Sequence, residues 1–551
     1  MEQARLVIAI ALSLFVFILW SFFFVEKKEG QPPKPTQEKE QKTDETPNIL
    51  KKEQVVAEKP ALPAKPLVIP LKTARTVTVK TPLYVVKISE KGAVFKSYVL
   101  KNYRESTDAD SPLLEMIPPD ISEKTIRLRF AGNSTSGLDD AVFSGDIDGD
   151  SVDITHKSKE ISFVWTSPQG VTVEKKFSFS PESYMIDLNV TVKNLSGKTL
   201  RDSIVLSLAQ PAEEKESRYG FTGPSALINN KLTQIKRKKI KDKNIYTGNI
   251  KWVAVQNRYF MSAIIPDDPE DGRMHLYVDD GVLTNRYVRP EMVMDSGARR
   301  AFKYKLFFGP KSMRVLKGLD YDLVKAVHFG MFDIIAKPCV WIMNFIYDHF
   351  IPNYGVAIIM LTLFTKIILW PLGNKSYKSM AEMKKIQPLM AEIREKYKDD
   401  KKRMNEEVMG LYKTYKVNPM GGCLPMLAQI PIFFALYRML YEAIELRHAP
   451  FFWWINDLSA PDRLFRFDIS IPFMQPPYGI PVLTIIMGAS MFVQQKMSPP
   501  MGDAAQAKMM MLMPLVFTVM FINFSSGLVL YWLVNNIISM AQQYYIQKKN
   551  V

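Results

Sequence analysis

Long apolar segments constrain this chain of 551 residues more than any other feature. Residues 6–25 form a continuous apolar run of 20 residues, long enough to cross a bilayer as a helix. Five more apolar segments are crowded into the C-terminal part, at about residues 338–372, 422–441, 479–496, 509–524 and 527–546. In lipid, a spanning segment must satisfy its own backbone polar groups, so such runs fold as helices. The sequence therefore predicts a polytopic α-helical membrane protein with six transmembrane helices.

The first apolar segment has the features of an uncleaved signal anchor. It is longer than the core of a typical signal peptide, and it ends in SFFFVEKK where cleavage would need small residues. Residues 26–70 are rich in Lys, Glu, Gln and Pro and have few bulky apolar side chains. Such a segment cannot bury enough apolar surface to fold, so we expect a disordered tether.

Residues 71–320 carry the pattern of β-strands. Apolar and polar residues alternate in runs such as those that begin at Tyr84 and Val171, and turn sequences such as Asn194-LSG separate them. This predicts one large antiparallel β-sandwich. Its inward-facing aromatic side chains are expected among Phe163, Trp165, Phe177, Phe179 and Trp252.

After this domain, residues 321–337 have apolar side chains at helical spacing, which predicts an amphipathic helix on the membrane surface.

A basic loop fixes the predicted orientation in the membrane. Residues 374–418 contain 12 Lys and Arg against 7 Asp and Glu, and the positive-inside rule places such short loops in the cytoplasm. The whole chain carries 72 Lys and Arg against 56 Asp and Glu, a formal net charge of +16. Nucleic-acid binding is another interpretation of that excess, but the placement of the lysines favours topology, and we expect no specific nucleic acid. Alternation then puts both termini in the cytoplasm and the β domain on the opposite side of the membrane.

The predicted segments follow one another along the chain. They are the signal anchor (1–25), tether (26–70), periplasmic β domain (71–320), interfacial amphipathic helix (321–337), second transmembrane segment (338–373), cytoplasmic helical hairpin (374–418), third transmembrane segment (419–442), periplasmic loop (443–478), fourth transmembrane segment (479–496), cytoplasmic loop (497–508), fifth (509–524) and sixth (527–546) transmembrane segments, and cytoplasmic tail (547–551). Cys339 and Cys423 open segments of opposite direction, so no disulfide between them is expected.

Signatures of catalysis and of metal binding are not found. The sequence has no Gly-x4-Gly-Lys-Ser/Thr phosphate loop and no His-Glu-x-x-His motif, and its five histidines are scattered. The sequence Asp146-IDGD lacks the spacing and the closing Glu of a calcium loop and predicts a hairpin turn instead. We therefore expect no cofactor and no metal.

Lys366 is a single charge inside the apolar run of residues 354–372. A charge at the centre of a spanning helix costs about 2.5–3.5 kcal/mol on insertion scales, so it usually serves a function. The alternative is a lysine near the helix end whose stem reaches the membrane interface. Polar residues also occur in the neighbouring segments, for example Gln429 and Asn535. Each of them alone is typical of a hydrogen bond between helices, whereas all of them together indicate a hydrated cavity among the helices. No intramembrane Asp or Glu is expected to pair with Lys366, which argues against a proton pump.

Four long motifs carry a family resemblance. They begin at Val417 (VNPMGGCLPMLAQIPIFFALYRML), Glu445 (ELRHAPFFWWINDLSAPD), Gln495 (QKMSPP) and Phe524 (FSSGLVLYWLVNN). Through them, and through the order of anchor, tether, β domain and five-helix core, the chain resembles the YidC/Oxa/Alb family of membrane protein insertases in its Gram-negative form. The β domain is similar to the β-supersandwich of that family, which itself resembles sugar-mutarotase folds.

The resemblance implies a hydrophilic groove among the core helices, open to the cytoplasm and sideways to lipid. Lys366 matches the position of an arginine that the family has in this groove. Lysine keeps the positive charge at this position but lacks the planar guanidinium group of arginine. The implied substrate-groove residues are Lys366, Thr362, Gln429, Tyr531 and Trp532. The residues implied at the substrate contact or lateral exit are Pro431, Phe433, Met513 and Pro514, and those on the cytoplasmic hairpin are Met380, Met383 and Met390.

The resemblance also implies the function and the partners. A protein of this kind inserts and helps fold integral proteins of the inner membrane, alone or with the Sec translocon. Its expected partners are nascent membrane proteins, the Sec translocon, the ribosome and the lipid bilayer.

The residues leave two other classes of protein open. A secondary transporter for a small anion would use Lys366 as its binding charge and predicts inverted repeats, which are not evident. A membrane-anchored carbohydrate-active domain would need an essential carboxylate or His pair within residues 71–320.

Overall fold

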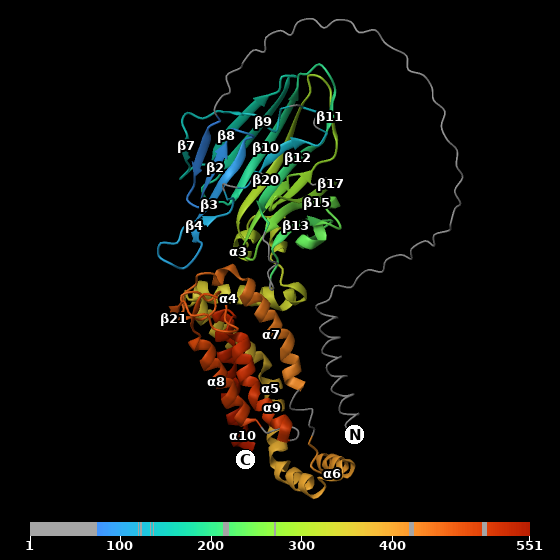
Figure 1. Ribbon diagram of the computed structural model, residues 1–551, viewed down its shortest axis with the longest axis vertical. Helices are drawn as coiled ribbons and strands as arrows, with labels where there is room; N and C mark the ends of the chain where they lie inside the picture. The colour runs from blue at the N-terminus through green and yellow to red at the C-terminus, as the bar shows by residue number, and fades with distance from the viewer. Residues whose placement is uncertain are drawn as a thin grey trace, which may run out of the picture. The chain divides into compact units, whose positions relative to one another are not determined.

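The computed structural model describes residues 74–118, 121, 124–132, 134–135, 137–212, 220–268, 271–417, 424–498 and 504–550 (Figure 1). The predicted signal anchor (1–25) and tether (26–70) lie outside the described residues. The chain divides into two compact units, one of residues 72–388 and 412–551 and another that contains residues 389–411. Each unit is considered by itself.

Residues 76–310 form a large β-sheet domain. Its strands are β1 (Thr76–Lys80), β2 (Tyr84–Ser89), β3 (Val94–Arg104), β4 (Leu113–Glu115), β5 (Arg127–Phe130), β6 (Ser144–Gly145), β7 (Ser151–Asp153), β8 (Lys159–Thr166), β9 (Val171–Phe179), β10 (Met185–Asn194), β11 (Leu200–Asp202), β12 (Ile204–Pro211), β13 (Gly223–Ile228), β14 (Lys231–Gln234), β15 (Ile245–Gln256), β16 (Phe260–Pro266), β17 (Asp271–Asp279), β18 (Val282–Val288), β19 (Met292–Met294) and β20 (Arg299–Pro310). Short helices α2 (Arg237–Ile240) and α3 (Met313–Lys317) accompany them.

Two sheets make up most of this domain. The smaller has the order β4-β3-β2-β1-β7, and the larger runs β5-β12-β18-β17-β15-β16-β20-β10-β9-β8-β6, with β13 on β15 and β14 on β13. Among the described residues the strands pair antiparallel, as predicted, except that β1 and β7 pair in parallel. Strand β9 shows why the sequence folds this way. Its side chains alternate between buried and half-buried along all nine residues, so one face reaches the core.

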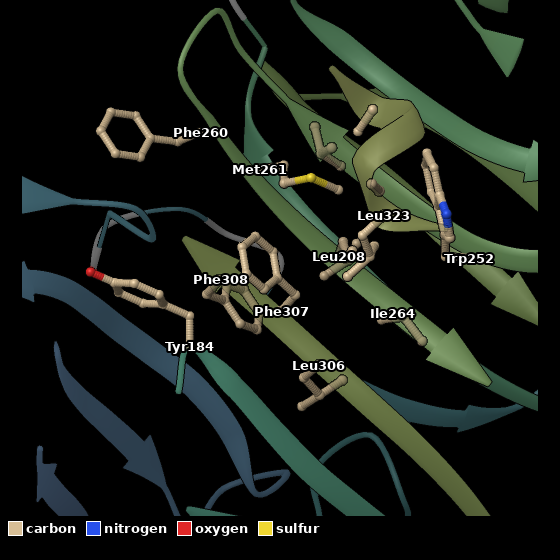
Figure 2. Packing of buried hydrophobic residues seen from close by; sticks show 14 of the residues in the cluster. Tyr184, Leu208, Trp252, Phe260, Met261, Ile264, Leu306, Phe307, Phe308 and Leu323 are labelled. Atoms are coloured by element: carbon tan, nitrogen blue, oxygen red, sulfur yellow. The ribbon is translucent and has the colours of Figure 1, made fainter. Parts of the chain in front are cut away.

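The core between the sheets is aromatic. Phe308 of β20 lies 5.5 Å from Phe95 and 5.0 Å from Tyr98 of β3, measured between ring centroids, which joins the larger sheet to the smaller. Figure 2 shows Phe307 and Phe308 close together, with Trp252 of β15 among the buried side chains of the larger sheet. Of the aromatic residues predicted to face inward, Phe163, Phe177, Phe179 and Trp252 are buried and Trp165 is half-buried against the core.

The C-terminal region is helical. Its elements are the 3-10 turns η1 (Leu323–Ala326) and η2 (Gly330–Phe332), the helices α4 (Asp333–His349), α5 (Tyr354–Lys396), α6 (Lys401–Thr414) and α7 (Leu424–Glu442), the turn η4 (Ile444–Leu446), the strands β21 (Leu464–Phe467) and β22 (Tyr478–Ile480), and the helices α8 (Val482–Met497), α9 (Ala504–Phe521) and α10 (Ser526–Asn550). Among the described helices, α5 alone is both long and apolar enough to cross a membrane, and Met509–Phe521 is a shorter apolar stretch.

Two predicted segments differ from the structure at their boundaries. Residues 321–337 were expected to form one amphipathic helix, but they form η1, η2 and the first turn of α4. Gly330 has a φ of 72°, outside the helical region, and the carboxylate of Asp333 accepts a hydrogen bond from the backbone N–H of Phe329, so the helix begins at Asp333. Residues 338–373 are divided between α4 and α5. The break contains Pro352, which cannot donate a helical hydrogen bond and disfavours helix at the preceding residue.

The predicted helical hairpin at 374–418 is helical in both arms. The first arm continues α5 to Lys396, and the second is α6 from Lys401. Between them the carboxylate of Asp400 accepts a hydrogen bond from the backbone N–H of Arg403 at 3.1 Å, which stabilises the start of α6.

Candidate functional site

A cavity of about 610 Å³ lies among the C-terminal helices. Its wall is built by α5, α7, α8, α9 and α10, and it combines polar and apolar side chains. The polar side chains come chiefly from α5, α8 and α10, among them Ser376, Gln494, Gln495 and Asn536. A cavity of this size and polarity has room for several water molecules.

Lys366 lies on the wall of this cavity and is 8% exposed. Its ammonium nitrogen donates a hydrogen bond to Oγ of Ser539 at 2.7 Å, and that hydroxyl donates in turn to the backbone carbonyl of Asn535 at 2.7 Å. No carboxylate forms an ion pair with Lys366 among the described residues. The charge is therefore held by a hydroxyl group, which leaves it uncompensated and able to attract an anionic group.

Helix α10 supplies the polar face that faces Lys366. Asn535, Ser539 and Gln542 follow one another at spacings of four and three residues and so share one helix face. Gln429 of α7 donates from Nε2 to Oδ1 of Asn535 at 3.1 Å. Gln542 donates from Nε2 to Oδ1 of Asn374 in α5 at 2.9 Å. These bonds tie α10 to α7 and α5 while keeping polar groups along the cavity.

A second set of bonds ties α10 to α8. Nδ2 of Asn536 donates to Oγ of Ser490 at 3.1 Å, and Nε2 of Gln543 donates to Oγ of Ser498 at 3.4 Å. Both pairs are largely removed from solvent, because Asn536 and Gln543 are buried. Helix α10 is thus the central element of the site, with polar contacts to three other helices.

Other parts of the wall are apolar. Phe433 of α7 and Trp532 of α10 meet edge to face with ring centroids 4.6 Å apart, and Phe517 of α9 lies 6.3 Å from the same indole. Met513 and Pro514 of α9 continue this surface. One cavity therefore presents a buried positive charge and polar groups together with aromatic and thioether groups.

Most residues proposed from the sequence come together here. Lys366, Gln429, Tyr531, Trp532, Phe433, Met513, Pro514 and Met380 line the cavity. Thr362 does not line it: this residue lies buried one turn before Lys366 and donates from Oγ1 to the carbonyl of Ile358 at 2.7 Å. Pro431 lies inside α7 away from the cavity wall, and Met383 and Met390 lie beyond it along α5.

Sequence reasoning missed several polar lining residues, namely Ser376, Tyr377, Ser498, Ser539, Gln542 and Gln543. The pattern Asn535, Ser539, Gln542 was the available signal, since polar residues at helical spacing mark one face of an otherwise apolar segment. Within the described part of the chain, no three His, Cys, Asp or Glu side chains come together as a metal ion would need.

Fold and cavity together define the class: a protein with a large β-sheet domain and a helical C-terminal region that encloses a cavity of mixed polar and apolar lining. Comparison with known proteins gives the family. A family described as "YidC periplasmic domain" matches residues 76–342, and one described as "60Kd inner membrane protein" matches residues 345–551. The chain belongs to the YidC family of membrane protein insertases, which confirms the resemblance found in the sequence.

Individual relatives match over nearly the whole chain. The "Membrane protein insertase YidC" of Syntrophus aciditrophicus (strain SB) is 40% identical over 561 residues, covering 99% of both chains. That of Syntrophobacter fumaroxidans (strain DSM 10017 / MPOB) is 41% identical over 557 residues, covering 99% of this chain and 100% of the relative. A solved structure titled "Active YidC insertase crystal structure with the first transmembrane domain resolved" is 20% identical, with a TM-score of 0.37 over 86% of this chain and 93% of that one. The protein is an inner-membrane insertase with a periplasmic domain, and it is not an enzyme.

Proposed function

We propose that the cavity is the groove through which the polar flank of a nascent membrane protein crosses the bilayer. The observation that carries this proposal is the buried ammonium group of Lys366, which lies on the cavity wall beside a hydroxyl and outside any described ion pair. Moving a charged tail through hydrocarbon is costly. A hydrated cavity shortens that path, and a positive charge within it attracts acidic side chains for the time of passage.

The apolar part of the substrate takes a different route in this proposal. Phe433 and Pro431 of α7, the third predicted span, and Met513 and Pro514 of α9, the fifth, form a lateral exit toward lipid. Unbranched, polarizable methionine side chains adapt to apolar partners of different shape. A substrate helix therefore leaves sideways between α7 and α9 without the formation of any covalent bond.

Topology and partners complete the proposal. Six spans place both termini, the hairpin (374–418) and the loop 497–508 in the cytoplasm. The hairpin makes the first contact with substrate through Met380, Met383 and Met390, and its basic side chains face the ribosome. The amphipathic helix α4 lies in the outer interface, where Ile334 (86% exposed) and Trp341 (60% exposed) contact lipid. The Sec translocon is the partner for substrates with large periplasmic parts.

Complementation of an insertase-depleted Gram-negative cell tests the role of Lys366. We expect Lys366→Arg to support insertion of a single-span substrate with an acidic periplasmic tail. Lys366→Ala and Lys366→Glu should fail, because one removes and the other reverses the attraction. Expression matched by immunoblot is the control. Equal insertion by all four proteins would show that the charge is not needed.

A further inference from the structure

The loop between α7 and α8 exposes bulky apolar side chains in a folded arrangement. Trp453 is 89% exposed, Phe473 81%, Ile469 73% and Phe465 72%. Single exposed apolar residues are common on protein surfaces. Four within one loop are unusual, and between Leu464 and Ile480 this loop has only two charged side chains, Arg466 and Asp468. We name Trp453, Phe465, Ile469 and Phe473 the apolar set of the loop.

The backbone is in the left-handed conformation at three of these four residues. Trp453 has a φ of 56°, Phe465 of 49° and Phe473 of 66°. Left-handed backbone is unfavourable for a bulky side chain and persists only where the surrounding structure imposes it. The most exposed aromatic residues of the loop are therefore held outward by its fold.

Buried polar residues fix this loop to the helices. The guanidinium group of Arg463 donates to the carbonyl of Pro477 at 2.9 Å, to that of Ile522 at 2.8 Å and to Oδ1 of Asn523 at 3.3 Å. Asn523 in turn donates from Nδ2 to the carbonyl of Phe473 at 2.7 Å. The β21–β22 hairpin is thus attached directly to the turn between α9 and α10.

These attachments set the depth of the loop relative to the spanning helices. Ile522 and Asn523 follow the last residue of α9, and the carboxylate of Asp462 accepts from the backbone N–H of Leu483 in the first turn of α8. Just inside these ends, Ile485 of α8 is 51% exposed and Met520 of α9 is 47% exposed. Phe465 and Phe473 therefore lie on a hairpin that adjoins the ends of α8 and α9, next to exposed apolar side chains of both helices, and in a spanning helix this is the level where aromatic side chains meet headgroups.

We infer that the apolar set is a lipid-binding surface that inserts into the outer-leaflet interface and holds the outer end of the helical region at a fixed depth. This inference rests on the topology proposed above. Lipid fits better than a protein partner, because the surface is apolar and aromatic, nearly free of charge, and continuous with helix faces that lipid covers.

Fluorescence quenching on the full-length protein tests the inference. Cys339 and Cys423 are replaced by Ala, and single cysteines are introduced as Trp453→Cys, Phe465→Cys or Phe473→Cys. Each variant is labelled with an environment-sensitive fluorophore and reconstituted into phosphatidylethanolamine–phosphatidylglycerol vesicles. Leu195→Cys is the control, since Leu195 is an apolar side chain, 53% exposed, on a turn of the β domain. Doxyl lipids probe contact with the interface, and iodide probes contact with water.

We expect doxyl lipid to quench the three loop sites about twofold or more, and iodide to quench them about threefold less than the Leu195 site. Iodide quenching equal to that of the Leu195 site would overturn the inference. Exposure in pure vesicles combined with protection in native membranes would also overturn it, in favour of a protein partner. Insertion activity is measured on the same variants. If lipid shields the loop sites but the protein does not insert substrate, the proposed function is contradicted and the lipid-binding surface is supported. If the protein inserts substrate but lipid does not shield the loop sites, the lipid-binding surface is contradicted and the proposed function is supported.

Discussion

The hydroxyl of Ser539 holds the buried charge of Lys366 at a hydrogen-bond distance of 2.7 Å. We predict that Ser539→Ala lowers insertion of a substrate with an acidic tail by about threefold to tenfold, because a hydrogen bond to a charged group contributes about 1.5–3 kcal/mol and water restores part of it. Ser539→Thr keeps the hydroxyl and should retain activity. The measurement is insertion into proteoliposomes with acidic and neutral tails. An equal loss for both tails would contradict a role through Lys366 and indicate a packing defect.

A second buried lysine, Lys175, lies in the β domain and makes stability depend on pH. Its ammonium nitrogen contacts the carbonyls of Ala93 and, at 2.7 Å, of Ile126. Burial lowers its pKa to about 7, whereas an unfolded lysine has a pKa near 10.4. The unfolded state therefore binds more protons between pH 7 and 10, and the free energy of unfolding rises with pH across that window.

We predict that Lys175→Met removes this contribution. Denaturant unfolding of the full chain in detergent, followed by tryptophan fluorescence at pH 7 and pH 9, measures it. The gain in stability from pH 7 to 9 should be smaller in the variant by about 1–2 kcal/mol. Identical gains for wild type and variant would show that Lys175 does not titrate in this range.

Single residues also show how far the sequence predicts the site. Lys366 and Gln429 could be found because a charge or an amide is conspicuous in an apolar segment. Ser539 could not, because serine is common in spanning helices and only its distance to Lys366 reveals its role. Thr362 was proposed from the resemblance, but it bonds to its own helix and lies away from the cavity wall.

Among the elements, the strands were easier to predict than the boundaries of the first C-terminal helices. Strand β9 alternates strictly, so its pattern gives both its type and its buried face. The break between α4 and α5 lies inside one apolar run, where hydrophobicity gives no signal and only Pro352 marks the place. The start of α4 at Asp333 depends on a hydrogen bond that the carboxylate of Asp333 accepts from the backbone N–H of Phe329. The spacing of apolar residues in the sequence cannot show such a bond.

The hairpin of β21 and β22 depends on Arg463. We predict that Arg463→Ala frees the hairpin, because the partly buried carbonyls of Pro477 and Ile522 lose hydrogen bonds to a charged donor, which contribute about 1.5–3 kcal/mol each before water replaces part of them. Limited proteolysis of the protein in vesicles should then cut within residues 464–480. Arg466→Ala is the matched control, since the Arg466 side chain is 56% exposed. The same cleavage rate in both variants would contradict a holding role for Arg463.

In the compact unit of residues 72–388 and 412–551, the β domain makes direct contacts with the helical region. The guanidinium group of Arg258 lies 3.7 Å from the ring centroid of Tyr441 and donates to its carbonyl at 2.6 Å. Ser312 donates to the carboxylate of Glu445 at 3.0 Å, and burial raises the pKa of that carboxyl group. The sequence predicted the two parts separately, but not these contacts, because residues far apart in the chain meet only after both parts have folded.

Crosslinking of a stalled nascent chain is the sharpest test of whether substrate passes through the cavity. Single cysteines are introduced as Trp532→Cys, on the cavity wall, and Ile537→Cys, on the same helix but 50% exposed away from it. The nascent chain carries one cysteine beside its acidic tail. We expect a disulfide crosslink to position 532 and at least about tenfold less crosslinking to position 537. Equal crosslinking at both positions, or crosslinking at 537 alone, would contradict it.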